Sequence, residues 1–335
     1  MSVYNREVPA LTGASTSTIK GAVMALQGLA EITVGVPNVE ETSGFYREFG
    51  LSGSAPGVFA TADGGDQLRL VETAYRQLVE YTLRAESQDD LDRIAANASA
   101  KGLTIDRHDD GSISVVEPIV GVRARVAVQG DVSHVPFESP LMNTPGRSVR
   151  PGERAPAIFA SGPAQPRKLG HVLYGTTDIA ASTAFLTDVL GFRVSDTSAG
   201  IIAFLRCSED HHNVALVSSP VPFFHHSSWM VNDVDEIGQG AHNLLAVDAD
   251  RSVWGLGRHF LGSNLFWYFR DPAGNYAEYY ADLDQIPTSA EWEARDWAPD
   301  KSLYSWGPPV PRDFVEPRDI DAIAEAMSKE LKGTR

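Results

Sequence analysis

Apolar and polar residues alternate in short stretches along the chain, and longer segments with helical spacing separate these stretches. The clearest example is GLAEITVGVPNVEETSGFYREFGL, from Gly28 to Leu51, in which an alternating stretch is followed by a helical pattern that ends at Phe-Gly-Leu. A glycine in this place is a common helix stop, because it adopts a left-handed backbone conformation without strain. The pattern predicts a strand followed by a helix.

The same pattern recurs in LGHVLYGTTDIAASTAFLTDVLGF, from Leu169 to Phe192, where His171 occupies the position of Glu31. Short β-like stretches follow each of these helices, and each half of the chain then starts another strand, helix and group of strands. We therefore predict an α+β fold of four β-α-β-β-β units, paired into two similar domains.

Changes in composition predict five segments. A stretch rich in proline, glycine and arginine, NTPGRSVRPGERAPA, has the composition of a linker or an exposed loop. The last segment is rich in tryptophan and proline, and an amphipathic helix is expected near Asp319–Lys332. We expect this tail to pack on the second domain, or alternatively to form a lid over an active site. The segments are an N-terminal extension (1–24), a first domain (25–142), a linker (143–164), a second domain (165–285) and the C-terminal tail (286–335).

The charge balance excludes several partners. The 335 residues include 28 Lys and Arg against 44 Asp and Glu, which gives a formal net charge of −16. A chain this acidic is a poor ligand for nucleic acid or an anionic membrane surface. Its single cysteine, Cys207, excludes an internal disulfide and a thiolate zinc cluster. Without a signal-like start or a long apolar run, we expect a soluble, cytoplasmic protein.

Histidines cluster in the second half, with seven of nine between residues 171 and 259. His171 lies in the first predicted strand of the second domain, and His226 lies at the start of that domain's second unit. Glu278 lies in a late strand, with its side chain on one sheet face. A divalent metal would compensate a buried carboxylate beside two histidines, and two histidines with one carboxylate suit non-haem Fe(II). Alternatively, each histidine is an ordinary core residue.

The first domain lacks this set. It has Glu31 in place of His171, and Arg123 and Arg125 near the place that corresponds to Glu278. The asymmetry is expected if one copy is catalytic and its sister is structural.

The stretch GRHFLGSNLFWYFRDPAGNYAEYY supplies a more specific pattern: His259, Tyr268, an Asp-Pro-x-Gly turn and Glu278 followed by x-Tyr. With these motifs, residues 25–285 resemble the type I extradiol ring-cleavage dioxygenases of the vicinal oxygen chelate superfamily. The resemblance implies that each domain is a curved mixed sheet. It also implies an enzyme that cleaves a catechol ring beside its diol and adds both atoms of O2, and a homo-oligomer, with a tetramer common in the family.

The resemblance also assigns residues. His171, His226 and Glu278 would hold Fe(II), with Mn(II) as the alternative metal; His225 neighbours the site, and the register favours His226. In HHNVALV, His212 would be the acid–base residue. His211 is the alternative, expected otherwise to lie on the surface because neighbouring strand residues face opposite ways.

The same resemblance places further residues at the substrate. His259 and Tyr268 would hydrogen-bond the bound catecholate. The Arg295-Asp296-Trp297 segment is similar to one in homoprotocatechuate-type members, in which such an arginine contacts a substrate carboxylate. This chain has Trp254 where those members have a second arginine, so Trp254 and Phe204 favour a more apolar or larger substituent. A surface ion pair of Arg295 is the alternative.

Two other functions stay open at this point. The superfamily includes metal-dependent isomerases, lyases and thiol transferases, and the fold also serves ligand-binding proteins. The pattern of His259 and Tyr268 favours the dioxygenase.

Overall fold

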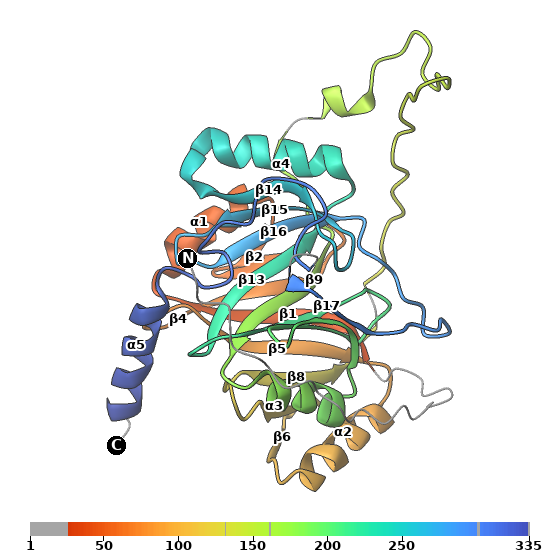
Figure 1. Cartoon of the computed structure of the whole chain (residues 1–335). Helices are drawn as coiled ribbons and strands as arrows, with labels where there is room; N and C mark the ends of the chain where they lie inside the picture. The colour runs from red at the N-terminus through yellow and green to blue at the C-terminus, as the bar shows by residue number, and fades with distance from the viewer. Residues whose placement is uncertain (1–25, 131, 161, 300–301, 334–335) are drawn as a thin grey trace.

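The computed structural model of the chain describes residues 26–130, 132–160, 162–299 and 302–333 (Figure 1). The predicted N-terminal extension lies outside these residues. Four β-α-β-β-β units follow one another, as predicted, so the α+β fold is confirmed. The first two units are β1 (Leu26–Val36), α1 (Val39–Glu48), β2 (Ser52–Ala55), β3 (Val58–Ala60), β4 (Asp66–Glu72), then β5 (Gln77–Ala85), α2 (Gln88–Ala100), β6 (Ile105–Arg107), β7 (Ile113–Val116) and β8 (Arg123–Val128).

The second half repeats this order after a short helical turn, η1 (Pro156–Phe159). Its units are β9 (Lys168–Thr176), α3 (Ile179–Ala184) with its π-helical continuation η2 (Phe185–Leu190), β10 (Arg193–Ser198), β11 (Ile202–Arg206), β12 (Val214–Ser218), then β13 (Phe223–Met230), α4 (Val234–Val247), η3 (Ala249–Arg251), β14 (Ser252–Arg258), β15 (Leu265–Arg270) and β16 (Tyr276–Ala281). The tail adds β17 (Arg295–Trp297) and α5 (Ile320–Gly333), the helix expected there.

Each half forms one mixed sheet. The first sheet has the order β2-β3-β4-β1-β5-β8-β7-β6, and the second has the order β14-β15-β16-β13-β9-β12-β11-β10-β17. Read from opposite ends, the two orders correspond strand for strand, with β17 as an addition at the edge. In both sheets the first strand of the half pairs in parallel with the fourth strand of its own unit, and antiparallel with the first strand of the next unit.

Local signals fix the ends of the helices. Asn38, Asp178 and Asp233 precede α1, α3 and α4, and the side chain of each accepts a hydrogen bond from a backbone N–H of the first turn. Gly50 and Gly191 follow the first helix of each half with φ angles of 99° and 84°. The two glycines therefore end these helices as the repeat predicts.

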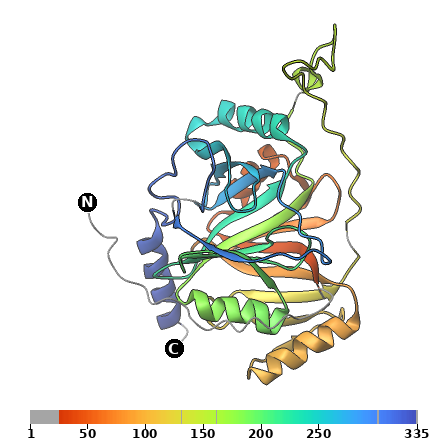
Figure 2. The ribbon, with the colours of Figure 1, turned by 45° about the vertical axis from the view of Figure 1, so that its right-hand side comes forward.

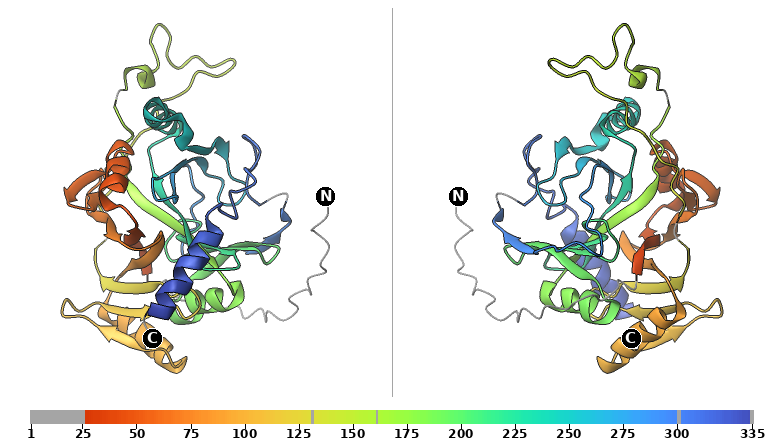
Figure 3. Two further views of the ribbon diagram at one scale, coloured as in Figure 1. Left: turned by 90° about the vertical axis from the view of Figure 1, so that its left-hand side faces the viewer. Right: turned by 90° about the vertical axis from the view of Figure 1, so that its right-hand side faces the viewer.

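The two halves pack through a shared apolar core, and Figure 3 shows the first half (red to yellow) beside the second (green to blue). Phe49, just after α1, stacks on Tyr279 of β16 with ring centroids 4.1 Å apart. The Tyr279 hydroxyl donates to the Phe49 carbonyl at 2.6 Å, and Gln67 Oε1 accepts from the backbone N–H of Leu169 at 2.7 Å. These contacts fix the second half of the chain against the first.

The tail returns over the second half. Strand β17 pairs in parallel with β10, opposite Asp196, Thr197 and Ser198. Helix α5 packs Ile320 and Ile323 beside apolar residues of the second sheet. Residues 132–160 form a long arm. Its first residues contact the body of the protein, His134 through Asp63 and Val135 through Arg167, and the rest extends away from both sheets (Figures 1 and 2). None of the helices in the described ranges is long and apolar enough to cross a membrane.

Candidate metal centre and active site

Three neighbouring strands bring His171, His226 and Glu278 together. His171 lies on β9, His226 on β13 and Glu278 on β16, and Ser228 of β13 is paired with both His171 and Glu278. All three side chains are buried, and one ligand atom from each lies within 4.8 Å of the others. Glu278 Oε2 is 3.1 Å from His171 Nε2 and 3.7 Å from His226 Nε2.

The donor set fits a divalent cation. Within the part of the chain that the structure describes, His226 Nε2 and Glu278 Oε2 have no hydrogen-bond partner although both are buried. An unpartnered carboxylate oxygen is costly in the interior unless a cation compensates it. Burial raises the pKa of Glu278, but interactions with His171, His259 and His226 outweigh this effect and hold the pKa well below its ordinary value. The site therefore offers one anion and two imidazoles to a metal such as Fe(II) or Mn(II).

The sister sheet has a different set at the equivalent positions. Thr82 is paired with Glu31 and Arg125 just as Ser228 is paired with His171 and Glu278, and Glu80 takes the place of His226. These side chains make ion pairs instead: Glu31 with Arg69, Glu80 with Arg123, and Arg125 with Asp110. Two glutamates and an arginine thus replace the two histidines and the glutamate. The register puts Glu31 opposite Thr82 at the position of His171, and Arg125 at the position of Glu278, as the repeat predicts.

A narrow cavity adjoins the three residues. His212, His259 and Tyr268 line it together with His171 and His226. The His171 and His212 rings are 4.1 Å apart. His259 Nε2 is 2.9 Å from the Tyr268 hydroxyl, and its Nδ1 contacts the Leu303 carbonyl, so Nδ1 donates to the carbonyl and the phenol donates to Nε2. The structure thus gathers all six of these predicted residues at one place.

Electrostatics in this cavity favour the neutral forms of His212 and Tyr268. Burial lowers the pKa of His212 well below its ordinary value, and the neighbouring histidines lower it further. Burial and the Glu278 carboxylate raise the pKa of Tyr268 well above its ordinary value. Near neutral pH, His212 is therefore a neutral base and Tyr268 a protonated phenol.

His225 orients the ring of His226 through a hydrogen bond. The Nδ1 atoms of the two rings are 2.7 Å apart, and His225 Nε2 lies 2.6 Å from the Phe314 carbonyl. Because a carbonyl only accepts, His225 carries its proton on Nε2, and its Nδ1 accepts from Nδ1–H of His226. That leaves the lone pair of His226 on Nε2, facing Glu278. The role of His225 as a support for His226 was not visible in the sequence.

The expectation that His211 lies on the surface is wrong. His211 is fully buried. It lies in the loop before β12 and not in a strand, so the alternation of side chains along a strand does not apply to it. Its Nε2 lies 2.9 Å from Asp196 Oδ2, and its Nδ1 lies 3.1 Å from His212 Nδ1. Burial raises the pKa of Asp196, but hydrogen bonds from His211, Trp297 and Arg295 outweigh this effect and lower it.

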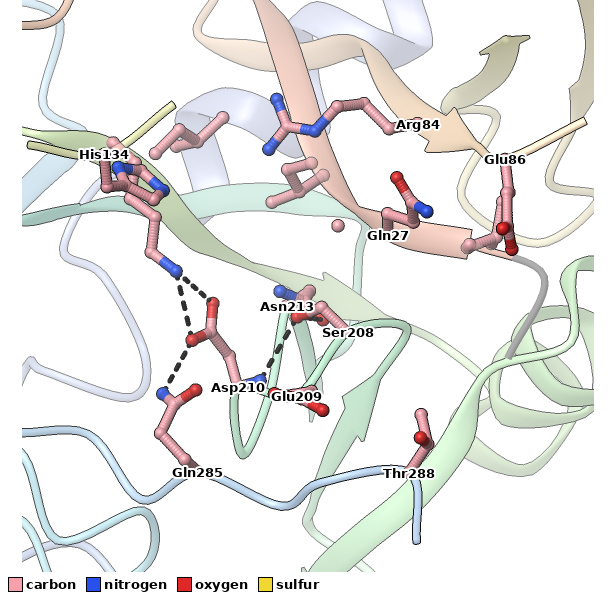
Figure 4. A pocket seen from close by; sticks show the side chains of 15 residues that line it. Gln27, Arg84, Glu86, His134, Ser208, Glu209, Asp210, Asn213, Gln285 and Thr288 are labelled. Carbon is pink, nitrogen blue, oxygen red and sulfur yellow. Dashed lines mark hydrogen bonds and ion pairs between the residues drawn. The ribbon is translucent and has the colours of Figure 1, made fainter. Parts of the chain in front are cut away.

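A polar cavity of about 440 Å³ lies on the other side of this loop, between the two halves (Figure 4). In it, Asp210 accepts from Lys168 Nζ at 2.8 Å and from Gln285 Nε2 at 2.8 Å. Asn213 Oδ1 accepts from the backbone N–H of Cys207 at 2.8 Å. These bonds hold both ends of the loop that carries His211 and His212.

The predicted substrate-contact residues separate in the structure. Phe204 lines the cavity beside His212. Trp254 does not line the cavity but stacks on Tyr268, which does, with the ring centroids 5.9 Å apart. Its Nε1 donates to the Pro308 carbonyl. Arg295 is outside this cavity: its exposed guanidinium pairs with Glu293, the ion pair given above as the alternative.

Sequence reasoning missed several residues at the site. Asn264 Nδ2 donates to Glu278 Oε1 at 3.2 Å and so occupies the oxygen that does not face the two histidines. Phe314, Ser302 and Leu303 of the tail line the cavity. The contribution of the tail residues could not be predicted, because they are far from the strands in sequence and no pattern links them to the site.

Comparisons with known proteins agree with this architecture. A family model described as the Glyoxalase/Bleomycin resistance protein/Dioxygenase superfamily matches residues 168–279. Metapyrocatechase 2 of Cupriavidus necator is 43% identical over 185 residues, 54% of this chain and 58% of that protein. The chain thus spans little more than half the length of that relative.

A biphenyl-2,3-diol 1,2-dioxygenase of Paraburkholderia xenovorans (strain LB400) is 30% identical over 242 residues, 65% of this chain and 76% of that protein. An iron-dependent extradiol dioxygenase of Rhodococcus jostii (strain RHA1) is 32% identical over 154 residues, 42% of this chain and 50% of that protein. The solved Mn(II)-bound glyoxalase from Novosphingobium aromaticivorans superposes with a TM-score of 0.67 at 24% identity, over 88% of this chain and 97% of that one. At this identity the superposition supports the fold.

Proposed function

Because the chain belongs to the glyoxalase/bleomycin resistance protein/dioxygenase superfamily, in its extradiol dioxygenase branch, we propose that it cleaves a catecholic ring beside the diol with O2. Both oxygen atoms enter the product. One observation supports this activity above the others: the two buried histidines that adjoin a buried glutamate line a cavity together with His212, His259 and Tyr268.

His171, His226 and Glu278 would hold the metal, Fe(II) or alternatively Mn(II). When bound, such a cation lowers the pKa of a catechol hydroxyl and brings both reactants together. Residues 165–285 would then form the catalytic domain, 25–142 the structural one, 143–164 the linker and 286–335 the docked tail.

The chain's own residues supply proton transfer and orientation. A neutral His212 at the cavity wall can take a proton from the substrate and return it during ring opening. The Tyr268 phenol and His259 form a bonded pair that can turn toward a substrate oxygen and hold the ring in one orientation.

The cavity wall indicates the kind of catechol. Leu173, Ile202, Phe204, Leu261 and Phe314 give it an apolar lining, and the Arg295 guanidinium lies elsewhere. No arginine lines this wall among the residues that the structure describes. Such an apolar wall favours a catechol with a hydrocarbon or aryl substituent over one with a carboxylate.

Oxygen uptake tests the proposal. The protein is freed of metal, reconstituted anaerobically with Fe(II) or Mn(II), and supplied with air and catechol, 3-methylcatechol, 2,3-dihydroxybiphenyl or homoprotocatechuate. We expect a yellow ring-fission product, its mass increased by two oxygen atoms, with the uncharged substrates preferred. If no member of this panel consumes oxygen while the metal stays bound, the dioxygenase assignment is wrong and an isomerase, lyase, thiol transferase or binding role takes its place.

We also propose a homo-oligomer, with a tetramer as the expected state and the arm of residues 132–160 as its contact. The arm exposes Val135, Phe137, Leu141, Met142, Ile158 and Phe159. Exposed apolar groups of this number are typical of an interface. The arm also contains Arg147, Arg150 and Arg154, which suit the acidic surface of a second copy. Light scattering should report a single larger species for the wild type, and a smaller one when Phe159, Ile158 and Met142 are changed to serine.

A further inference from the structure

The neighbourhood of His212 contains two buried groups to which the proposed reaction assigns no role. His211 and Asp196 are both buried, and neither side chain lines the cavity beside the metal-ligand set. Asp196 Oδ2, His211 and His212 follow one another through two short contacts, 2.9 Å and 3.1 Å. The geometry of these two contacts decides which ring nitrogen of each histidine carries the proton.

The first contact fixes the proton of His211. A carboxylate only accepts hydrogen bonds, so the His211 nitrogen that faces Asp196, Nε2, bears the proton. A neutral imidazole has one N–H, and Nδ1 of His211 is then an acceptor.

The second contact fixes the proton of His212 in turn. His211 Nδ1 faces Nδ1 of His212, and two acceptors cannot bond, so His212 carries its proton on Nδ1. Its Nε2 is left with a lone pair. His212 lines the cavity with His171 and Tyr268, and Nε2 is the ring nitrogen still available to a substrate.

We propose that Asp196 and His211 are positioning residues that hold His212 in the Nδ1–H tautomer and keep its Nε2 available as a base toward the cavity. The proposal rests on the proposed function for the role of His212, but its structural part concerns the protein without metal or substrate.

The tail extends this chain of contacts. Asp196 Oδ1 accepts from the backbone N–H of Arg295 at 3.0 Å and from Trp297 Nε1 at 3.0 Å. Both donors belong to β17, which is paired with β10 at Asp196. The Arg295–Trp297 segment therefore acts on the site through its backbone and its indole, and not through the Arg295 guanidinium.

These two donors make one substitution especially informative. In Asp196→Asn, the amide oxygen has to stay with the two β17 donors, and the NH₂ group then faces His211 Nε2. His211 would have to accept there and donate from Nδ1, and His212 would have to accept at Nδ1 and carry its proton on Nε2. The substitution thus inverts both tautomers with almost no change in volume.

The experiment is long-range ¹H–¹⁵N spectroscopy of the metal-free full chain, labelled with ¹⁵N-histidine, at pH 8. Histidine signals are assigned by single substitution. We expect the Nδ1–H tautomer for His212 in the wild type and the Nε2–H tautomer in Asp196→Asn. His211→Asn keeps an acceptor oxygen near His212 and should preserve the wild-type tautomer, whereas His211→Leu should not.

Steady-state kinetics then tests the consequence. We expect kcat to fall at least tenfold in Asp196→Asn and His211→Leu, with KM for the catechol and bound metal per chain within twofold of the wild type, and partial recovery in His211→Asn. An Nε2–H tautomer at His212 in the wild type would overturn the proposal, as would an imidazolium at His211 or full kcat in His211→Leu. If the tautomers are as expected but the wild type consumes no oxygen with any catechol, the proposed function fails and the positioning of His212 stands.

If His211→Leu does not fold, Asp196→Asn and His211→Asn still decide the matter, because the tautomer is read directly from each spectrum.

Discussion

The Arg76 guanidinium holds both carboxylate oxygens of Asp319, with Nε 2.6 Å from Oδ2 and Nη2 2.8 Å from Oδ1. Arg76 follows β4 in the first half, and Asp319 precedes α5 in the tail. The remaining guanidinium nitrogen contacts the Phe224 carbonyl, next to His225. One buried arginine therefore joins the first half, the tail and the strand that carries His226.

Removal of Asp319 should loosen the tail. The Arg76 side chain is only 2% exposed, so Asp319→Ala leaves a buried guanidinium short of two charge-assisted bonds. We expect the free energy of unfolding to fall by about 1–3 kcal/mol at pH 7. Urea denaturation measures this loss, and Asp321→Ala, an exposed acid in the same helix, is the control. Equal stability of the two variants would contradict a structural role for the pair.

The same pair predicts a pH dependence. Burial raises the pKa of Asp319, but the bonds from Arg76 outweigh it and lower the pKa below its ordinary value. The unfolded state then binds more protons than the folded state as pH falls. The stabilising contribution is complete above about pH 4 and is lost as pH falls through the lowered pKa. The difference in stability between wild type and Asp319→Ala should therefore shrink below about pH 4. A difference that stays constant from pH 7 to pH 3 would show that the ion pair is not its source.

Glu278→Gln should abolish metal binding. The amide keeps the shape of the side chain but removes the single anion that faces His171 and His226. We expect about one equivalent of Fe(II) or Mn(II) per wild-type chain and almost none in the variant. Binding should also raise the Tm of the wild type alone, because a ligand of the folded state stabilises it.

Glu31→Gln is the matched control for this experiment. Glu31 occupies the position of His171 in the sister sheet, where it pairs with Arg69. Its loss should leave metal content unchanged. Metal loss in Glu31→Gln, or its retention in Glu278→Gln, would place the centre elsewhere.

His225→Phe should weaken metal binding without removing a ligand. His226 would lose the acceptor that keeps its proton on Nδ1 and its lone pair on Nε2. Loss of such a support typically costs 10–100-fold in metal affinity. Titration with Mn(II) measures the affinity, and His225→Asn, which restores an acceptor, should recover part of it. Unchanged affinity in His225→Phe would mean that Glu278 and the strands orient His226 without help.

His212→Phe should separate chemistry from metal binding. The ring stays in van der Waals contact with Phe204 but cannot accept a proton. We expect a 10²–10⁴-fold lower kcat with metal content unchanged. Metal analysis and oxygen uptake on the same sample decide this. A variant that loses its metal would make His212 a ligand, and one that keeps its activity would exclude it as the base.

The sequence by itself determined the four-unit fold and the contrast between its halves. Strand alternation and helix stops at Gly50 and Gly191 are local, and the internal repeat alone aligns Glu31 with His171. Because strands that pair in register bring equivalent positions together, these signals also predicted that His171, His226 and Glu278 would meet.

Tertiary structure alone decided the surroundings of that site. The burial of His211, its contact with Asp196 and the bonds from β17 depend on separate segments, one of them in the tail, that meet only when the chain folds. The alternation rule failed at His211 because it applies to paired strands, and this residue lies in a loop held by Asp210 and Asn213. Arg295 likewise faces solvent, because β17 adds to the edge of the sheet at β10 and presents its backbone, rather than its guanidinium, to the interior. A periodic pattern records which face of an element is buried, but the groups that come to cover that face are fixed only when distant segments pack together.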